Sequence, residues 1–416
     1  MLSDPVSISS LDRRQFLRSA GALGLGALVV GRISRALAAD DADVIRLPFQ
    51  NGTRPLVKYP QKRALIRLTS RPPQLETPFA VFNEGPITPN DAFFVRYHLA
   101  NIPTEIDVAN YRLSLDGSVR EPLRFSVADL KTRFEPVEIT AVNQCSGNSR
   151  GFFNPRVVGG QLGNGAMGNA RWKGVRLRDV LDHAGVGAKA RQVTFNGLDE
   201  PVIAATPDFV KALDLDHARD GEVMIAYEMN GSDLPVLNGF PLRLVVPGYY
   251  GTYWVKHLSA MTVVDEPFAG FWMQKAYRIP DTPDASIEPG SAMKTSVPIT
   301  RFNVRSFITS HADGASVAKG RETVLRGIAF DGGQGIREVG YSWDGGRTWH
   351  EARLGKDLGR YSFREWTGAF TPGRAGKFEL KCRAVTRSGE TQPDHPGWNP
   401  SGYMRNVVES VNLIAV

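Results

Sequence analysis

The spacing of apolar residues predicts a chain of short strands with a few short helices. Helical spacing over 177–184 ends at Gly185, and Ser126 with Asp129 forms a capping-box pattern that opens another helix. A further short helix is expected from Thr206-Pro207, because Thr can cap a helix and Pro suits its first turn. Apolar runs of strand length lie at 93–99, 111–118, 192–196, 224–229 and 242–246.

The last third of the chain follows the two-residue period of strands. Val339, Tyr341 and Trp343 alternate with other residues before a glycine-rich turn at 344–346, after which Thr348-Trp349 begin a return strand. The even positions of 378–384 are apolar, which predicts a half-buried strand with Cys382 facing inward. Short strands spread over about 120 residues predict an antiparallel sandwich of immunoglobulin-like size. The predicted fold class is α+β, with a mixed domain followed by this β-sandwich.

The length of 416 residues predicts two or three domains. Residues 39–90 are rich in Pro, Thr and Asn and lack periodicity, so they are interpreted as an arm that wraps the surface. The proline-rich stretch 279–297 is interpreted as a linker. These features divide the chain into a segment at 1–38, a first domain at 39–290 and a C-terminal domain at 291–416.

The N-terminus has the three parts of an export signal. Arg13-Arg14 precede Phe16-Leu17, an apolar stretch covers 20–30, and Ala36-Leu37-Ala38 offers a small-residue cleavage site. The paired arginines favour a twin-arginine signal over an ordinary secretory one, which predicts export of the folded protein to the periplasm. The apolar stretch is too short for a stable bilayer span, so no membrane anchor is expected after cleavage.

Charge and cysteine content narrow the possible functions. The net charge is +7, but five arginines against two aspartates in 1–38 supply +3 of it, which leaves a mildly basic surface and no argument for nucleic-acid binding. Cys145 and Cys382 can form at most one disulfide, and that pairing stays open as an alternative. Two cysteines exclude an iron–sulfur cluster held by this chain alone, and without a C-x-x-C-H motif no haem is expected.

Cys145 lies in the most chemically suggestive stretch of the chain, 142–151. Small and amide residues surround it, and Arg150 places a cation nearby that can attract an anion. A thiolate here is a suitable ligand for a soft transition metal, although a buried free cysteine is an equally simple interpretation. The glycines of 163–168 formally match the dinucleotide fingerprint G-x-G-x-x-G. No apolar helix follows them, so the stretch is interpreted as a loop beside the cysteine.

Several further motifs occur in a fixed order around this cysteine. They are F-F-x-R-x-H at 93–98, C-x-G-N-x-R at 145–150, G-A-x-x-x-A-R-W at 165–172, A-Y-E-M-N-G at 226–231, N-G-F-P-L-R-L-V-V-P-G at 238–248, V-K at 255–256, Tyr277 after Trp272-Met273-Gln274, and the S-W-D-G-G-x-T-W hairpin. With these motifs, the chain from about residue 60 onward resembles the sulfite oxidase family of mononuclear molybdenum-pterin enzymes. Within that family it is most similar to bacterial periplasmic sulfite dehydrogenases.

The resemblance implies a role for individual residues. Cys145 would be the protein ligand of molybdenum, and Arg96, Arg150 and Tyr277 would line the substrate pocket. The positions implied to contact the molybdopterin cofactor are Phe94, His98, Cys145, Asp199, Asn238, Arg243, Trp254 and Lys256. Asn238 stands where the vertebrate enzymes have a histidine, and the pocket tryptophan expected near Leu162 has no counterpart. Arg405 is a candidate for a further pocket arginine.

The resemblance also implies an activity and partners. Sulfite would be oxidised to sulfate, and an external c-type cytochrome would accept the electrons because this chain has no haem motif. The C-terminal sandwich resembles the family's dimerisation domain, so a homodimer is expected. Two alternatives remain open: a molybdenum-pterin reductase of sulfoxides or another oxyanion, and a non-catalytic secreted binding protein with an immunoglobulin-like domain. The second would leave the Cys145 stretch and the paired arginines unexplained.

Overall fold

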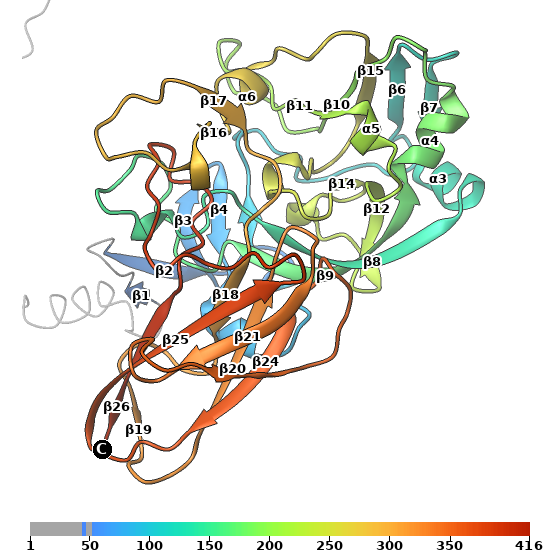
Figure 1. Ribbon diagram of the computed structural model, residues 1–416. Helices are drawn as coiled ribbons and strands as arrows, with labels where there is room; N and C mark the ends of the chain where they lie inside the picture. The colour runs from blue at the N-terminus through green and yellow to red at the C-terminus, as the bar shows by residue number, and fades with distance from the viewer. Residues whose placement is uncertain (1–43, 47–51) are drawn as a thin grey trace, which may run out of the picture. The chain divides into compact units, whose positions relative to one another are not determined.

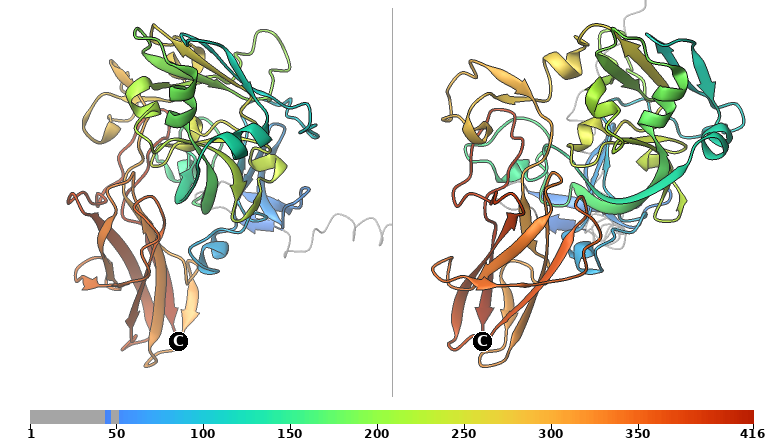
Figure 2. Two further views of the ribbon diagram at one scale, coloured as in Figure 1. Left: turned by 90° about the vertical axis from the view of Figure 1, so that its right-hand side faces the viewer. Right: turned by 45° about the vertical axis from the view of Figure 1, so that its right-hand side comes forward.

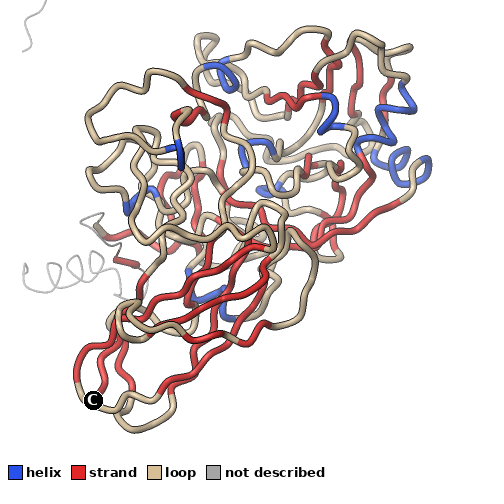
Figure 3. The backbone as a smooth tube through the Cα atoms, viewed as in Figure 1, coloured by secondary structure: helices blue, strands red, loops and turns tan. Residues whose placement is uncertain are grey.

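Strands form most of the regular structure in the computed structural model, which describes residues 44–46 and 52–416. Figure 1 shows the order of the elements, and Figure 3 shows the helices as short segments among longer strands and loops. The chain is therefore mostly β with few helices. The predicted export signal at 1–38 lies outside the described residues. Within the part that is described, no helix has the length and apolar character needed to cross a membrane.

The segment interpreted as an arm that wraps the surface contains strands. After the short strand β1 (Val44–Arg46), the strands β2 (Thr53–Val57), β3 (Leu65–Ser70), β4 (Pro73–Glu76) and β5 (Val95–Arg96) pair in sequence as antiparallel neighbours. These strands were not predicted, because the sheet buries few side chains, among them Leu65 and Leu75, and its prolines obscure the alternation of apolar and polar residues. The 3-10 helix η2 (Phe79–Asn83) connects β4 toward β5.

A long antiparallel pair positions the cysteine. β8 (Pro136–Gln144) pairs along its whole length with β9 (Met167–Arg176), so that Gln144 lies opposite Met167 and Cys145 follows directly. β9 also pairs with β12 (Met224–Met229), which pairs in turn with β13 (Ser232–Asp233) and β14 (Arg243–Val245). The chain between Cys145 and Met167, which includes the 3-10 helix η3 (Arg150–Phe152), is therefore a connection between two buried strands.

The helices predicted from local signals form next to a second sheet and directly after β9. The strand order of this second sheet is β11 (Lys211–Asp214), β10 (Gln192–Asn196), β15 (Ala260–Val264), β6 (Leu113–Gly117) and β7 (Leu123–Phe125). The capping box at Ser126 and Asp129 is confirmed at the start of α3 (Val127–Arg133), and Gly185 ends α4 (Leu177–Ala184) in the left-handed conformation that favours glycine. A shorter helix, α5 (Leu215–Ala218), follows β11.

The helix expected from Thr206-Pro207 does not form. The chain is irregular there until it enters β11, and two tertiary contacts hold it: the indole of Trp272 donates to the Pro207 carbonyl, and the Asn196 amide donates to the Asp208 carboxylate. A cap and a proline at the right spacing were insufficient, because tertiary contacts override a local signal worth about 1 kcal/mol.

The expected linker at 279–297 is partly structured. β16 (Arg278–Pro280) pairs with β17 (Ser296–Pro298), and the 3-10 helix η6 (Pro283–Ala285) lies between them. Ile279 and Ala285 are buried in the same cluster as Tyr277, so this stretch packs against the site instead of only connecting domains. The remaining short elements are α6 (Phe271–Gln274), η4 (Val236–Asn238) and η5 (Gly251–Tyr253).

The C-terminal part is a sandwich of two sheets. One has the order β18 (Arg305–Ile308), β20 (Thr323–Phe330), β24 (Arg364–Phe370), β23 (Arg353–Leu354), and the other β19 (Ala315–Val317), β26 (Ser410–Ala415), β25 (Gly376–Thr386), β21 (Ile336–Ser342), β22 (His350–Glu351). Both sheets contribute to one buried cluster, which includes Trp366 and the inward-facing Cys382. Figure 2 shows these strands running side by side toward the C-terminus. The predicted hairpin is confirmed as β21 and β22, and its return strand begins at His350, two residues later than expected.

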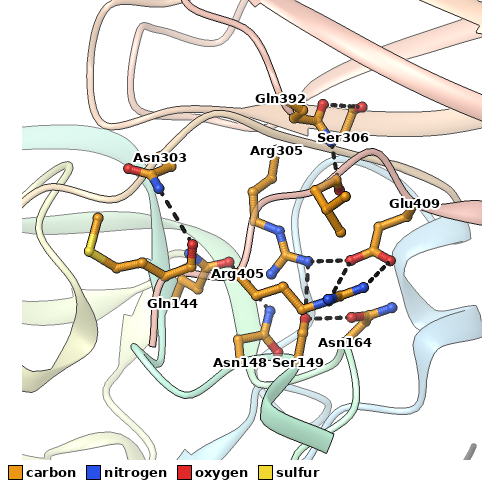
Figure 4. A network of polar contacts seen from close by, with 12 residues as sticks. Gln144, Asn148, Ser149, Asn164, Asn303, Arg305, Ser306, Gln392, Arg405 and Glu409 are labelled. Atoms are coloured by element: carbon orange, nitrogen blue, oxygen red, sulfur yellow. Dashed lines mark hydrogen bonds and ion pairs between the residues drawn. The ribbon is translucent and has the colours of Figure 1, made fainter. Parts of the chain in front are cut away.

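A buried ion pair connects the sandwich to the loop that follows Cys145. Arg305, only 1% exposed, donates to the Glu409 carboxylate at 3.0 Å and to the Ser149 hydroxyl at 3.0 Å (Figure 4). Arg405 also pairs with Glu409, its Nε 3.4 Å from the same carboxylate oxygen. The Ser149 hydroxyl in turn donates to the side-chain oxygen of Asn164 at 2.5 Å, which extends the network within the loop. The sandwich therefore helps to fix the cysteine loop.

Replacing Glu409 by Gln should destabilise the protein strongly. The substitution leaves two closely spaced arginine cations without their carboxylate, and removing one partner of a buried pair costs about 3–5 kcal/mol. Urea unfolding followed by fluorescence measures the change in free energy of unfolding. Glu379→Gln is the matched control, because that glutamate pairs with Lys381 at the surface and should cost less than about 1 kcal/mol. Equal losses for the two variants would contradict the prediction.

Candidate functional site

Cys145 opens onto two connected cavities. The residues around the inner cavity come from several separate segments of the N-terminal domain. Its lining is Phe94, Arg96, His98, Asn143, Cys145, Ser146, Phe209, Leu237, Asn238, Arg243, Gly251, Thr252, Trp254, Lys256 and Tyr277. The outer cavity shares Arg96, His98, Cys145, Ser146 and Tyr277 with it and adds Arg150, Trp272 and Tyr403. The cysteine thus lies where the two cavities meet.

Backbone hydrogen bonds hold the cysteine loop in place. The Cys145 amide donates to the Ala166 carbonyl at 2.9 Å, and its own carbonyl accepts from the Asn148 amide at 2.9 Å. The Asn148 side chain accepts from the Ala166 amide at 3.0 Å. These bonds tie the residues after β8 to those before β9, so the loop cannot move independently of the strand pair. The thiol at position 145 is partly exposed, and Cys382 is buried.

Arg150 is held at the outer cavity by a cradle of backbone and ring contacts. Its Nε donates to the Ser401 carbonyl at 3.1 Å, and its guanidinium lies 5.0 Å from the Tyr403 ring centroid. Gly147 makes room for it, since a Cβ there would lie 2.8 Å from the guanidinium carbon. Gly159, at φ +107°, does the same from the other side, at 2.9 Å from an Arg150 nitrogen. The two glycines thus leave space for the Arg150 guanidinium group.

Tyr277 and His98 form a hydrogen-bonded pair between the two cavities, joining the Tyr277 hydroxyl to His98 Nε2. Tyr277 adopts a left-handed φ of +56°, a strained conformation for a residue other than glycine, of the kind that clusters at functional sites. Burial raises the pKa of Tyr277, so its hydroxyl keeps its proton at neutral pH. Burial and the neighbouring cations Arg96, Lys256 and Lys211 lower the pKa of His98 well below its ordinary value, so its imidazole is neutral.

The far end of the inner cavity is lined with buried cations. Arg243 is buried against the rings of Trp172 and Trp254, 5.3 and 5.7 Å from their centroids, and burial lowers its pKa to about 10. Burial and the nearby Arg243 guanidinium lower the pKa of Lys256 to about 7, while the Asp199 carboxylate acts in the opposite direction. The Lys256 amine donates to the Arg96 carbonyl at 2.8 Å. This end of the cavity is therefore suited to an anionic group.

Asn238 is the centre of a small hydrogen-bond network in the cavity wall. Its side-chain nitrogen donates to the Phe94 carbonyl at 3.0 Å, its oxygen accepts from Lys62, and its carbonyl accepts from Arg243 at 3.0 Å. Lys62 also donates to the Phe93 carbonyl at 3.0 Å. Asn238 therefore connects the segments that form this wall of the cavity, and most of its hydrogen-bonding capacity is already used within the protein.

Several buried polar atoms around the inner cavity have no partner in the described part of the chain. They are both amide atoms of Asn143, the hydroxyls of Ser146 and Thr252, and Nε of Arg243. Leaving such groups unpaired costs about 1–3 kcal/mol each, so the cavity is preorganised for a ligand that is polar over much of its surface.

The structure brings most of the sequence-predicted site residues together, with two exceptions. Asp199 does not line either cavity and lies behind Lys256, where burial raises the pKa of its carboxyl group. Arg405 pairs with Glu409 and lines neither cavity. Both cysteines are free, so the alternative Cys145–Cys382 disulfide does not form.

Sequence reasoning missed several residues of the cavity walls. Asn143 and Ser146 flank Cys145 in the chain, so proximity alone could have indicated them. Phe209 and Tyr403 carry no local signal, yet Phe209 stacks on His98 at 3.8 Å and Tyr403 stacks on Tyr277 at 5.5 Å. Trp272 lies at the outer cavity, 5.0 Å from His98. The site therefore does contain a tryptophan, but it comes from a segment far in sequence from Leu162, near which the family resemblance had implied one.

Two protein-family models match the chain. Residues 98–272 match the oxidoreductase molybdopterin binding domain, and residues 296–415 match the Mo-co oxidoreductase dimerisation domain. Among solved structures, the sulfane dehydrogenase SoxCD from Paracoccus pantotrophus has the same fold, with a TM-score of 0.71 over 94% of this chain and 93% of that one, at 24% identity.

Characterised relatives match over most of the chain. The mitochondrial sulfite oxidase of Rattus norvegicus is 34% identical over 92% of this chain and 70% of its own length. The sulfite oxidase of Gallus gallus is 36% identical over 84% of this chain and 78% of its own length. Together with the two domain matches, these relatives show that the chain belongs to the sulfite oxidase family of molybdopterin oxidoreductases.

Proposed function

We propose that this protein oxidises sulfite to sulfate at a molybdopterin centre. The observation that carries the proposal is the meeting of Cys145, Arg96 and Tyr277 at the junction of the two cavities, with Arg150 facing the outer one. The relatives named sulfite oxidase, at 34% and 36% identity, support the same substrate. Sulfite is a small anion, and a pocket with two arginines suits it.

The residues of the inner cavity fit the cofactor. Arg243 and Lys256 would hold its terminal phosphate, and the unpaired polar atoms of Asn143, Ser146 and Thr252 would meet its polar ring system. Cys145 would supply one thiolate to the metal. The described residues contain no group of three or more His, Cys, Asp or Glu side chains that could hold an ion alone, which agrees with a metal carried largely by its cofactor. When bound, the molybdenum cofactor supplies two-electron redox and oxygen-transfer chemistry.

The chain itself would bind, orient and manage protons. Arg96 and Arg150 offer charge to a sulfite anion, and Arg150 is already fixed by Ser401 and Tyr403, so little side-chain freedom is lost on binding. Tyr277 holds a proton on its hydroxyl beside the neutral His98. That hydroxyl can donate a hydrogen bond to the substrate while it accepts one from the neutral imidazole, so neither group has to change its charge.

We also propose the partners and the location of the enzyme. Two electrons must leave after each turnover, and an external c-type cytochrome is the proposed acceptor, since the sequence offers no haem motif. The paired arginines at 13–14 support export of the folded protein to the periplasm. The match of 296–415 to a dimerisation domain supports a homodimer formed through an immunoglobulin-like sandwich.

A steady-state assay tests the function directly. Purified protein from a host that makes the cofactor should contain about one molybdenum per chain. It should also reduce a c-type cytochrome only when sulfite is added. Turnover of a sulfoxide with no activity toward sulfite would replace the proposal by a reductase of the same family. Absence of molybdenum after such expression would contradict an enzyme of this type.

Replacing Cys145 by Ser should nearly abolish sulfite oxidation while the fold stays intact. A serine oxygen is a harder metal ligand than a thiolate. Mutating a residue that only supports a metal ligand typically lowers activity about tenfold to hundredfold, so loss of the ligand itself should lower kcat by more than about a hundredfold. Circular dichroism checks the fold. Cys382→Ser is the control, since that cysteine is buried in the sandwich. Wild-type turnover in the Cys145 variant would exclude the ligand assignment.

Replacing Arg96 by Met should mainly raise the KM for sulfite. The variant loses a cation at the junction of the cavities, and a hydrogen bond to a charged group contributes about 1.5–3 kcal/mol, so an increase of about tenfold or more is expected. Initial-rate kinetics with varied sulfite measure it. Arg124→Met, an exposed change on β7, should leave KM unchanged. If the Arg96 variant keeps the wild-type KM, sulfite binds elsewhere.

A further inference from the structure

Lys211 is a buried lysine that the proposed reaction does not use. It lies on β11 and is only 1% exposed. Burial lowers the pKa of Lys211 to about 7, and no neighbouring carboxylate in the described part of the chain offsets this effect. Burying an unpaired ammonium group is costly, so its position near a functional site calls for a physical reason.

The Lys211 ammonium group connects three segments around the site. Nζ donates to the Trp272 carbonyl at 2.7 Å. It also lies 4.5 Å from the ring centroid of Tyr253, in η5, and 5.3 Å from that of Tyr277. A hydrogen bond and two cation–π contacts thus replace the missing carboxylate. Because Trp272 and Tyr277 are five residues apart in one segment, a single ammonium group holds both ends of it.

The segment that Lys211 holds forms one wall of the outer cavity, which includes both Trp272 and Tyr277. The Trp272 ring lies 5.0 Å from His98 and 5.2 Å from Phe209, and its indole donates to the Pro207 carbonyl at 3.2 Å. The tryptophan is therefore fixed at two points, by Pro207 at the ring and by Lys211 at the backbone. Without the second contact, the Tyr277 end of the wall would still be held by the Ile299 amide, but the Trp272 backbone would lose its hydrogen bond to Lys211.

The charge of Lys211 also acts on the cavity, although the side chain does not line it. The lysine is one of three cations that lower the pKa of His98, with Arg96 and Lys256. When it is protonated, Lys211 therefore places positive charge near His98, which lines both cavities. Solvent and salt screen charges weakly in a buried site. A charged side chain that lies behind the residues lining the cavity therefore still contributes to anion binding.

We propose that Lys211 is a positioning residue for the reaction, whose ammonium group holds Trp272 and Tyr277 in the wall of the outer cavity and strengthens anion binding there. This inference rests on the proposed sulfite oxidation for its kinetic consequence. The contacts with Trp272 and Tyr277 are independent of it.

The test compares Lys211→Met with Lys211→Arg in the cofactor-loaded enzyme. Methionine keeps the length of the side chain but removes its charge and its donors, whereas arginine keeps both. Lys189→Met is the matched control, because Lys189 is exposed and the substitution changes the net charge equally. Two measurements need no turnover: amide hydrogen exchange of a peptide covering 270–278, and the rise in melting temperature caused by sulfate. The third is the split between KM and kcat for sulfite.

In the Lys211→Met variant, the backbone amides of 270–278 should exchange hydrogen faster than in the wild type. The variant should bind sulfate about tenfold more weakly, and its KM for sulfite should be about tenfold higher, with kcat changed less. Lys211→Arg should retain slow exchange and most of the anion affinity, and this variant decides the question if the methionine variant does not fold. Wild-type exchange and wild-type sulfate binding in Lys211→Met would overturn the proposal. If the wild-type enzyme does not oxidise sulfite, the proposed function fails, and the exchange and sulfate measurements still decide the role of Lys211.

Discussion

Buried positive charge with little compensating negative charge is the constraint on which this site depends. Arg243, Lys256 and Lys62 lie in or behind one wall of the inner cavity, and burial lowers the pKa of each. Asp199 is the buried carboxylate that acts on Lys256, and its own burial raises its pKa, so its charge is costly too. Such a wall is stabilised when an anion with more than one charge occupies it. The terminal phosphate of the cofactor meets that requirement.

The cofactor end and the substrate end of the site are mechanically connected. The Lys256 amine donates to the Arg96 carbonyl, so a group held by Lys256 also fixes the strand that presents the Arg96 guanidinium. Lys62 acts similarly through Asn238, which holds the Phe94 carbonyl two residues earlier. Placement of the substrate arginine is therefore linked to occupation of the anionic end, since both depend on the short segment 94–98.

Features determined by a few neighbouring residues could be predicted from the sequence, and features determined by distant contacts could not. The capping box at Ser126 and the end of the helix at Gly185 are local and were predicted to the residue. The expected helix at Thr206 failed because Trp272 and Asn196 hold that segment from other elements. The assembly of most site residues in one cavity followed from the order of family motifs. Phe209 and Tyr403 were missed, because stacking on His98 and Tyr277 leaves no mark in their own sequence.

The C-terminal half contributes to the site as well as to assembly. The segment before β26 places Ser401 and Tyr403 against Arg150, and Arg305 reaches Ser149 in the cysteine loop. Both contacts act on the residues that directly follow the proposed metal ligand. A protein with the same N-terminal domain but no sandwich would have to hold this arginine by other means, and its anion pocket would differ accordingly. The sandwich is therefore part of what makes this pocket suitable for a small oxyanion, independently of any role in dimerisation.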